Sequence, residues 1–378
     1  MSSVFSGVIE KPLFTAFAKY AKSTATDDKI KAYAALVSEI YSSKSSLAEL
    51  VFRLVSEDEN VYIKSRAHNL PIREEITEAV RRELDTFEKF ASLTPEEFSD
   101  DMGVEFVSPF KTNKIDFQKN YEERIANVSR YGYGIFSSFC MFRLSDERTI
   151  EPIVSADKTS VEKFVGYEEE RGRVIDNTVA FIESRPAANT LLCGDAGTGK
   201  SSTVKAVANK FFDKGIRLIE LRKDQLSYLP YVMGKISENP LKFIIFIDDL
   251  AFNRSDDNFS MLKAALEGSA SAKADNAVIY ATSNRRHIIK ETFADREGNE
   301  VHINDTLQET LSLSERFGLV VLFSKPNKAL YLDIVHELAK RNNIKMDMNE
   351  LDTRAEAFAL RRGSRSARCA EQFIDSLM

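Results

Sequence analysis

One run of eight residues combines glycines, a lysine and a serine at a spacing that suits phosphate binding. It reads Gly194-Asp195-Ala196-Gly197-Thr198-Gly199-Lys200-Ser201 and follows the short apolar stretch Leu191–Cys193. Glycines at these positions let the backbone curl so that its N–H groups point at phosphate oxygens. In this pattern the lysine reaches the β- and γ-phosphates of a nucleotide, and the serine hydroxyl completes the shell of a Mg²⁺ ion. We therefore predict a nucleotide site over residues 194–202, with Ser202 included.

A helix is expected directly after this loop. Apolar residues recur with helical spacing at Val204, Val207, Ala208 and Phe211. The first turn of such a helix carries unpaired N–H groups and the positive end of the helix dipole, both of which favour bound phosphate.

Polar residues also follow two apolar runs further along the chain. Asp248 and Asp249 come after Phe243–Ile247, and Asn284 closes the run that begins at Ala277. Ligands of open parallel sheets bind at the carboxyl ends of strands, so Asp248 suits Mg²⁺ opposite the serine, and Asp249 suits activation of water. Asn284 would hydrogen-bond the γ-phosphate or the attacking water. The alternatives are that the carboxylates cap a helix and that the asparagine is a turn residue.

Length and composition place the chain among ordinary globular proteins. It has 378 residues, 43% of them hydrophobic and 29% charged, with a net charge of −6. This charge gives no argument for nucleic-acid or membrane partners, and no apolar stretch approaches the length of a membrane span. Three widely spaced cysteines form neither a disulfide framework nor a zinc site, so we expect a cytoplasmic protein.

The periodicity of apolar residues divides the chain into four parts. Residues 1–125 are predicted to be a mostly helical accessory or docking domain, and 126–160 a connecting segment. Residues 161–325 alternate between helices and apolar strands, which predicts an α/β P-loop core of three layers with a five-stranded parallel sheet. Residues 326–378 are predicted to form a small helical lid. The strands are expected at Leu191–Cys193, Ile216–Leu221, Phe243–Ile247, Val278–Ala281 and Leu319–Phe323.

The order of these features resembles the AAA+ ATPases. More narrowly, the chain is similar to a bacterial AAA+ group known only as an ATP-binding domain of unknown function, number 815. The similarity runs from about Ile153 to the C-terminus. It depends on the phosphate loop together with Phe164–Tyr167, Ala281–His287 and Leu311–Gly318.

The resemblance implies where the cofactor ATP and its Mg²⁺ are held. Val165 and Gly166 would contact the adenine, and Asn284 would be the sensor-1 residue. In most AAA+ proteins a glutamate follows the metal-binding aspartate, whereas this chain has Asp249. The shorter side chain predicts slow turnover, unless Glu267 substitutes for it.

The resemblance also assigns two arginines. Arg316 would be the arginine finger that acts on the γ-phosphate of a neighbouring subunit, which implies a homo-oligomer. Arg365 would be the sensor-2 arginine, with Arg368, one helical turn further on, as its rival. A guanidinium suits both roles because it neutralises charge on the transferring phosphoryl group.

The sequence thus favours a Mg²⁺-dependent ATPase that couples hydrolysis to the remodelling of an unidentified protein client, held by the N-terminal helical domain. One alternative is a nucleotide-gated adaptor with little hydrolysis. Another is an ATP-dependent loader or remodeller of DNA, suggested by five arginines against one glutamate over residues 354–368.

Overall fold

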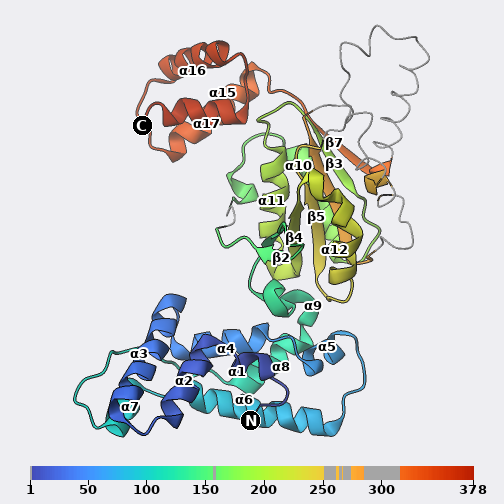
Figure 1. The fold of residues 1–378 in the computed structure, drawn as a ribbon. Helices are drawn as coiled ribbons and strands as arrows, with labels where there is room; N and C mark the ends of the chain where they lie inside the picture. Colours follow the sequence, from blue (N-terminus) through green and yellow to red (C-terminus); the bar gives the residue numbers. More distant parts are fainter. Residues whose placement is uncertain (1, 156–158, 251–260, 264–265, 267–273, 285–315) are drawn as a thin grey trace. The chain divides into compact units, whose positions relative to one another are not determined.

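A computed structural model describes residues 2–155, 159–250, 261–263, 266, 274–284 and 316–378 (Figure 1). The chain forms two compact units. One comprises Met1–Ser138 with Asn239–Leu241, and the other comprises Phe139–Glu238 with Lys242–Met378.

The first unit is helical. Some of its helices begin at a capping side chain, as at α4, where the Ser46 hydroxyl accepts from the Glu49 N–H and the Glu49 carboxylate accepts from the Ser46 N–H. The elements are α1 (Ser6–Ile9), α2 (Pro12–Lys22), α3 (Thr26–Ser43), α4 (Leu47–Glu57), α5 (Val61–Ala67), α6 (Glu74–Ala91), α7 (Pro95–Met102), α8 (Phe117–Ala126), α9 (Val128–Tyr131) and the 3-10 turn η1 (Gly134–Ser137).

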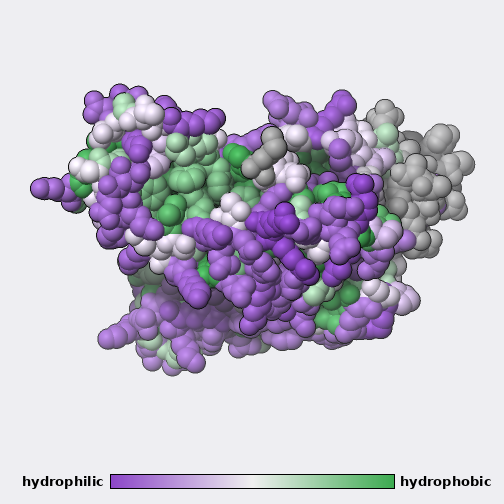
Figure 2. Space-filling view, turned by 90° about the horizontal axis from the view of Figure 1, so that it is seen from below, coloured by the Kyte–Doolittle hydropathy of each residue, from purple (hydrophilic) through white to green (hydrophobic). Residues whose placement is uncertain are grey.

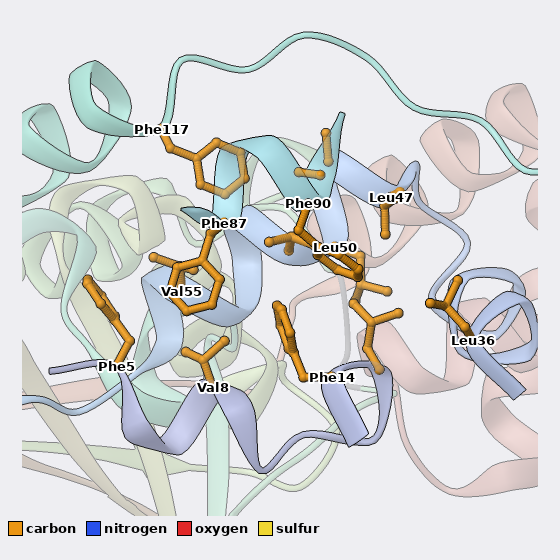
Figure 3. Close-up of a cluster of buried hydrophobic side chains, with 14 of the residues drawn as sticks. Phe5, Val8, Phe14, Leu36, Leu47, Leu50, Val55, Phe87, Phe90 and Phe117 are labelled. Carbon is orange, nitrogen blue, oxygen red and sulfur yellow. The ribbon is translucent and has the colours of Figure 1, made fainter. Parts of the chain in front are cut away.

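The core of the helical unit is rich in aromatic side chains. Phe14 and Phe87 meet edge to face, with ring centroids 5.4 Å apart. Pairs of this kind add to the stabilisation that comes from burial of apolar surface. Figure 3 shows the surrounding side chains, which include Phe5, Val8, Leu36, Leu47, Leu50, Val55, Phe90 and Phe117.

One carboxylate is buried beside this core. Glu83 of α6 is only 9% exposed and accepts hydrogen bonds from the N–H groups of Ser3, Val4 and Phe5, at 2.7 to 3.2 Å. The Ser2 and Ser3 hydroxyls donate to it as well. The carboxylate therefore fastens the first residues of the chain to α6.

The second unit is built on one sheet in the strand order β2-β1-β4-β5-β6-β3-β7. The five predicted strands are all present, and each is parallel to its neighbours among them. The strands are β1 (Met141–Leu144), β2 (Ile150–Pro152), β3 (Thr190–Gly194), β4 (Ile216–Leu221), β5 (Lys242–Ile247), β6 (Ala277–Ser283) and β7 (Leu319–Phe323).

The prediction of five strands is wrong, because the described residues form a sheet of seven strands. β1 pairs parallel to β4, and β2 pairs antiparallel to β1 at the edge of the sheet. Both strands lie in the stretch predicted to be only a connection. They have four and three residues, and β2 contains Pro152, which is tolerated at an edge. Such short segments carry too little alternation for the sequence pattern to reveal them.

Helices cover both faces of the sheet. Val204 and Val207 of α11 pack with Leu218, Ile244 and other strand residues at alternate positions. Figure 1 shows α10 and α11 on one face and α12 on the other, so the layers are helix, sheet and helix. The elements outside the sheet here are η2 (Val161–Lys163), α10 (Glu168–Ile182), α11 (Lys200–Lys210), η3 (Phe212–Lys214), η4 (Lys223–Tyr228) and α12 (Leu229–Ile236).

Three helices follow the last strand, α15 (Lys328–Arg341), α16 (Met348–Arg362) and α17 (Ala367–Asp375). They share a small core that contains Tyr331, Val335, Leu351, Ala355 and Phe373. Figure 2 shows a molecular face that is mostly hydrophilic, with hydrophobic residues in smaller patches. Among the described residues, no helix combines the length and apolar character that a membrane crossing requires.

Candidate functional site

The predicted phosphate loop connects β3 to α11, as the sequence requires. Gly194 ends β3 at φ 137°, and a Cβ built there would come 2.0 Å from the Phe323 carbonyl oxygen of β7. Only glycine fits so close to a neighbouring strand. Gly197 and Gly199 also have positive φ values, 78° and 88°, and α11 begins at Lys200. The free N–H groups of the first turn of α11 are thereby turned towards the loop.

Lys200 is folded onto the loop that precedes it. Its Nζ donates to the carbonyl oxygens of Gly194 and Asp195, at 2.9 and 2.6 Å, and to Oδ1 of Asn284 at 3.1 Å. The residue is 5% exposed, and this burial lowers the pKa of its ammonium group against the opposing effect of nearby Asp195. All three donors of the ammonium group are thus satisfied by the chain.

Ser201 and Asp248, the two predicted Mg²⁺ ligands, lie together. The Ser201 hydroxyl donates to Oδ1 of Asp248, with 2.6 Å between the oxygens. The Ser201 hydroxyl at the start of α11 and the Asp248 carboxylate after β5 supply oxygen ligands of the kind that Mg²⁺ prefers, with phosphates and waters completing its shell. The donor set therefore fits Mg²⁺. Within the described ranges no group of three or more His, Cys, Asp or Glu side chains could hold a metal ion.

Asp249 occupies an uncommon backbone conformation, with φ 50° in the left-handed region. Its N–H donates to Oδ1 of Asp248 at 3.1 Å and to Oγ1 of Thr282 at 3.0 Å. Its own Oδ1 accepts from Nδ2 of Asn284 at 2.7 Å. Asn284 thus bridges Lys200 and Asp249. Non-glycine residues in this region concentrate at functional sites, where the surroundings hold them in place.

A cavity of about 110 Å³ lies beside the phosphate loop. Its walls come from the segment before α10, from the loop and α11, and from helices α15 and α17. Of the predicted contacts, Val165, Gly197, Thr198, Gly199 and Ser202 line it, together with Lys163, Phe164, Arg171, Ile334, Leu338, Ala367, Arg368 and Glu371.

Gly166, the second predicted adenine contact, is not among the residues that line this cavity. Its φ is 72°, and a Cβ at this position would come 2.4 Å from Cδ1 of Leu330. Its carbonyl oxygen accepts a hydrogen bond from Arg171. Gly166 therefore shapes the turn that holds Val165 against the cavity.

The two candidate lid arginines have different surroundings. Arg365 donates to both carboxylate oxygens of Glu356, at 2.9 and 2.7 Å, in the side-by-side geometry that makes such pairs strong. Arg368 lines the cavity, and its backbone N–H donates to the Gly197 carbonyl oxygen of the loop at 3.3 Å. Of the two residues, the structure thus brings Arg368 to the loop.

Arg316 lies apart from the loop of its own chain. It is half-buried and stands three residues before β7. β3 and β7 run parallel, with Thr190 beside Leu319 and Gly194 beside Phe323. Arg316 is therefore at the amino edge of the sheet, and the loop is at the carboxyl edge, separated by five residues or about 16 Å of strand.

Two residues near the site were missed by the sequence analysis. Thr282 is 2% exposed and bonds both aspartates; it lies two positions before Asn284, a spacing that places both on one side of a strand. Arg171 is 6% exposed and lies over the Phe164 ring, 4.6 Å from its centroid, and burial lowers its pKa to about 10. Its spacing from Val174 puts it on the apolar side of α10, which is the sequence signal that could have indicated its burial.

Some predicted positions lie outside the described residues. These are Glu267, the residues that follow Asn284 in the run 281–287, and the part of the run 311–318 that precedes Arg316.

Comparison with known proteins gives one family and several more distant likenesses. Residues 135–378 match the model of a family described as "Protein of unknown function (DUF815)". The Chaperone proteins ClpB of Rickettsia bellii and Rickettsia felis are each 26% identical to the chain over 187 residues, 42% of this chain and 21% of theirs. The chain thus spans about a fifth of the length of these curated relatives.

Solved structures of RuvB from Thermotoga maritima are also similar. One point variant of RuvB has a TM-score of 0.36 and 12% identity, and a form described as a Holliday junction branch migration motor has 0.35 and 11%. In both cases the match covers 58% of this chain and 72% of the other.

Proposed function

Since the chain belongs to the DUF815 family, as the sequence resemblance to that AAA+ group predicted, we propose that it is a Mg²⁺-dependent ATPase of the AAA+ type. It would couple ATP hydrolysis to the remodelling of a protein client. One observation carries this proposal. Lys200 and Asp249, from separate elements, meet in one hydrogen-bonded cluster through Asn284, and Ser201 joins Asp248 beside them.

The cluster supplies the groups with which one copy of the chain would take part in phosphoryl transfer to water. Lys200 exchanges its two carbonyl acceptors for the β- and γ-phosphate oxygens, which are stronger acceptors because they are charged. Mg²⁺ held by Ser201 and Asp248 would neutralise charge on the same phosphates. Asn284 orients the Asp249 carboxylate through its Nδ2, and that carboxylate accepts the proton of the attacking water.

The cavity beside the loop suits the base of the nucleotide. At about 110 Å³ it is smaller than the ~300–1,000 Å³ of sites that enclose a whole ligand. This supports a nucleotide that places its base in the cavity and its phosphates along the open loop. Val165 and Ile334 line the cavity with apolar side chains, and Arg368 of the helical lid lines it with a cationic one.

The position of Arg316 supports assembly into a homo-oligomer. Because it lies at the amino edge of the sheet, its guanidinium is on the wrong side to reach the phosphates bound by its own loop. A finger role for Arg316 requires a neighbouring subunit whose carboxyl edge faces it. We therefore propose that each ATP is held between two copies of the chain, with the helical unit left to engage the client.

The DNA alternative is less favoured by the surroundings of the arginines over residues 354–368. Arg354 pairs with Glu350 at 3.5 Å, Arg365 is paired with Glu356, and Arg368 lines the cavity. This leaves fewer positive charges for a phosphate backbone than the sequence suggested. The adaptor alternative keeps its support, because Asp249 is one methylene shorter than the usual glutamate.

Calorimetry on Lys200→Ala tests the proposal. Removing a buried cation that faces bound phosphate is expected to weaken Mg·ATP binding by about 100-fold or more. Lys205→Ala, on the same helix but paired with Glu220, is the matched control and should bind normally. Equal affinity of Lys200→Ala and the unaltered protein would contradict the proposal. Single-turnover hydrolysis then separates ATPase from adaptor, since a chemical step no faster than spontaneous decay favours the adaptor.

A further inference from the structure

The buried hydroxyl of Thr282 forms hydrogen bonds with both aspartates of the candidate site, Asp248 and Asp249. We propose that Thr282 is a positioning residue that orients Asp248 and Asp249 and thereby sets the affinity of the site for Mg²⁺. This inference rests on the function proposed above, because it concerns the metal that accompanies ATP. Thr282 itself acts through the carboxylates and is not a ligand.

Thr282 fixes three consecutive residues after β5. Its Oγ1 donates to Oδ1 of Asp248 and accepts the N–H of Asp249 at 3.0 Å, and its carbonyl oxygen accepts the N–H of Leu250 at 2.7 Å. These contacts connect the carboxyl end of β6 to the turn that leaves β5. The side chain of Asp248 and the backbone of Asp249 are thus held by a single residue of the neighbouring strand.

The chemistry requires a hydroxyl at this position. The group must donate to a carboxylate on one side and accept an N–H on the other, and a threonine hydroxyl does both at once. Its β-branched side chain has few accessible rotamers, so the hydroxyl direction is set by β6. At 2% exposure, water has little access to replace it.

The strain at Asp249 makes the second contact important. A left-handed φ of 50° is unfavourable for a residue with a Cβ, and it persists only where surrounding contacts impose it. The Thr282 hydroxyl is one of two acceptors for the Asp249 N–H, and the other is Oδ1 of Asp248. Removing the hydroxyl takes away, among the described residues, one of the two acceptors of the Asp249 N–H and one of the three donors to Oδ1 of Asp248, which loosens both carboxylates. Partners that orient metal-binding carboxylates commonly account for about 10- to 100-fold in metal affinity.

The test compares Thr282→Val, which keeps the shape but lacks the hydroxyl, with Thr282→Ser, which keeps the hydroxyl. ATP affinity is measured by calorimetry with Mg²⁺ and with EDTA, and the ratio gives the contribution of the metal. Thr282→Val should reduce that ratio by about 10-fold or more while affinity in EDTA changes little, and Thr282→Ser should restore it. Thermal unfolding checks that each variant folds, and Thr282→Ala serves in place of valine if valine does not fold.

Thr190→Val is the matched control. Thr190 is also buried, but it lies at the end of β3 away from the phosphate loop and accepts a hydrogen bond from Asn177, so this substitution should leave the ratio unchanged. Equal loss in Mg²⁺ and in EDTA, or a serine variant no better than valine, would overturn the inference. If the unaltered protein binds ATP in neither condition, the proposed function fails and the inference falls with it. Binding that is unaffected by Mg²⁺ in the unaltered protein overturns the inference alone.

Discussion

Each of the two units buries a charged side chain, but the two side chains have different roles. In the helical unit, Glu83 is surrounded by N–H and hydroxyl donors of the chain's first residues, which hold the carboxylate in place. In the α/β unit, Lys200 takes two backbone carbonyls and the Asn284 side chain as acceptors beside an open loop. The first arrangement stabilises the fold by holding the first residues of the chain against α6. The second can exchange its acceptors for those of a ligand.

The difference teaches how to separate structural from functional polar burial. A buried group whose partners have no replacement contributes to stability, because its loss leaves donors unsatisfied. A buried group at the carboxyl edge of a parallel sheet, with partners that phosphate oxygens can replace, contributes to binding. Substitutions in the α/β site should therefore change ligand binding or turnover more than stability, and substitutions at Glu83 should do the reverse.

The largest expected effect is that of Arg316→Ala on turnover. If this guanidinium completes the site of a neighbouring copy, its loss should lower the rate of ATP hydrolysis by about 10³-fold or more while Mg·ATP binding is retained. Steady-state phosphate release and calorimetry measure the two quantities. Arg185→Ala, which removes a surface arginine paired with Glu183, is the control and should leave both unchanged.

Mixing two inactive variants tests whether Arg316 acts between subunits. Arg316→Ala keeps an intact loop, and Lys200→Ala keeps an intact finger, so a mixed assembly contains interfaces with both. Hydrolysis should reappear on mixing. If Arg316→Ala alone is as active as the unaltered protein, the finger assignment is wrong. If both variants are inactive and the mixture is inactive too, Arg316 does not act between subunits.

The next effect tests the helical side of the comparison. Burial raises the pKa of Glu83, but hydrogen bonds from Phe5, Ser2 and Ser3 outweigh it, so the pKa lies below the ordinary carboxyl value. Glu83→Gln should lower the free energy of unfolding by about 2–3 kcal/mol at neutral pH, since it weakens charge-assisted hydrogen bonds. Chemical denaturation of the full chain measures this difference.

The pH dependence of the same variant has a definite sign. Because the pKa is lowered on folding, the ionised carboxylate stabilises the protein above the ordinary carboxyl pKa, and this contribution is lost as pH falls through the lowered value. The gap between Glu83→Gln and the unaltered protein should therefore narrow in acid. Glu78→Gln, in an exposed pair with Arg82, should change stability by less than about 1 kcal/mol. A gap that widens in acid, or a change in ATP affinity, would contradict the division between the two units.

Local patterns were sufficient for part of this molecule. The phosphate loop and the five parallel strands follow from glycine spacing and continuous apolar runs, which depend on residues close in sequence. β1 and β2 were missed as strands because they have only four and three residues, and because β1 joins the sheet by pairing with β4, which lies far along the chain. Thr282 was missed because its importance comes from Asp248 and Asp249, which lie in the turn that follows another strand, β5.

The choice between the two candidate lid arginines also depends on contacts that the local sequence does not reveal. Arg365 and Arg368 are three residues apart and chemically identical, so the motif alone left both open. The carboxylate of Glu356, which lies on α16, accepts hydrogen bonds from the Arg365 guanidinium. The backbone N–H of Arg368 instead donates to the Gly197 carbonyl oxygen of the phosphate loop. Only the packing of α16 and α17 distinguishes the two residues.

The smallest expected effect decides between these arginines. Arg368→Ala should weaken Mg·ATP binding by about 10-fold, because the substitution removes the cavity-lining guanidinium that we propose contacts the bound nucleotide. Arg365→Ala should change binding by less than about twofold, since that guanidinium is already committed to Glu356. Calorimetry on the two variants under identical salt makes the comparison. A larger loss at Arg365 than at Arg368 would mean that the pair with Glu356 breaks when nucleotide binds, and the lid arginine would then be the one that the family motif assigns.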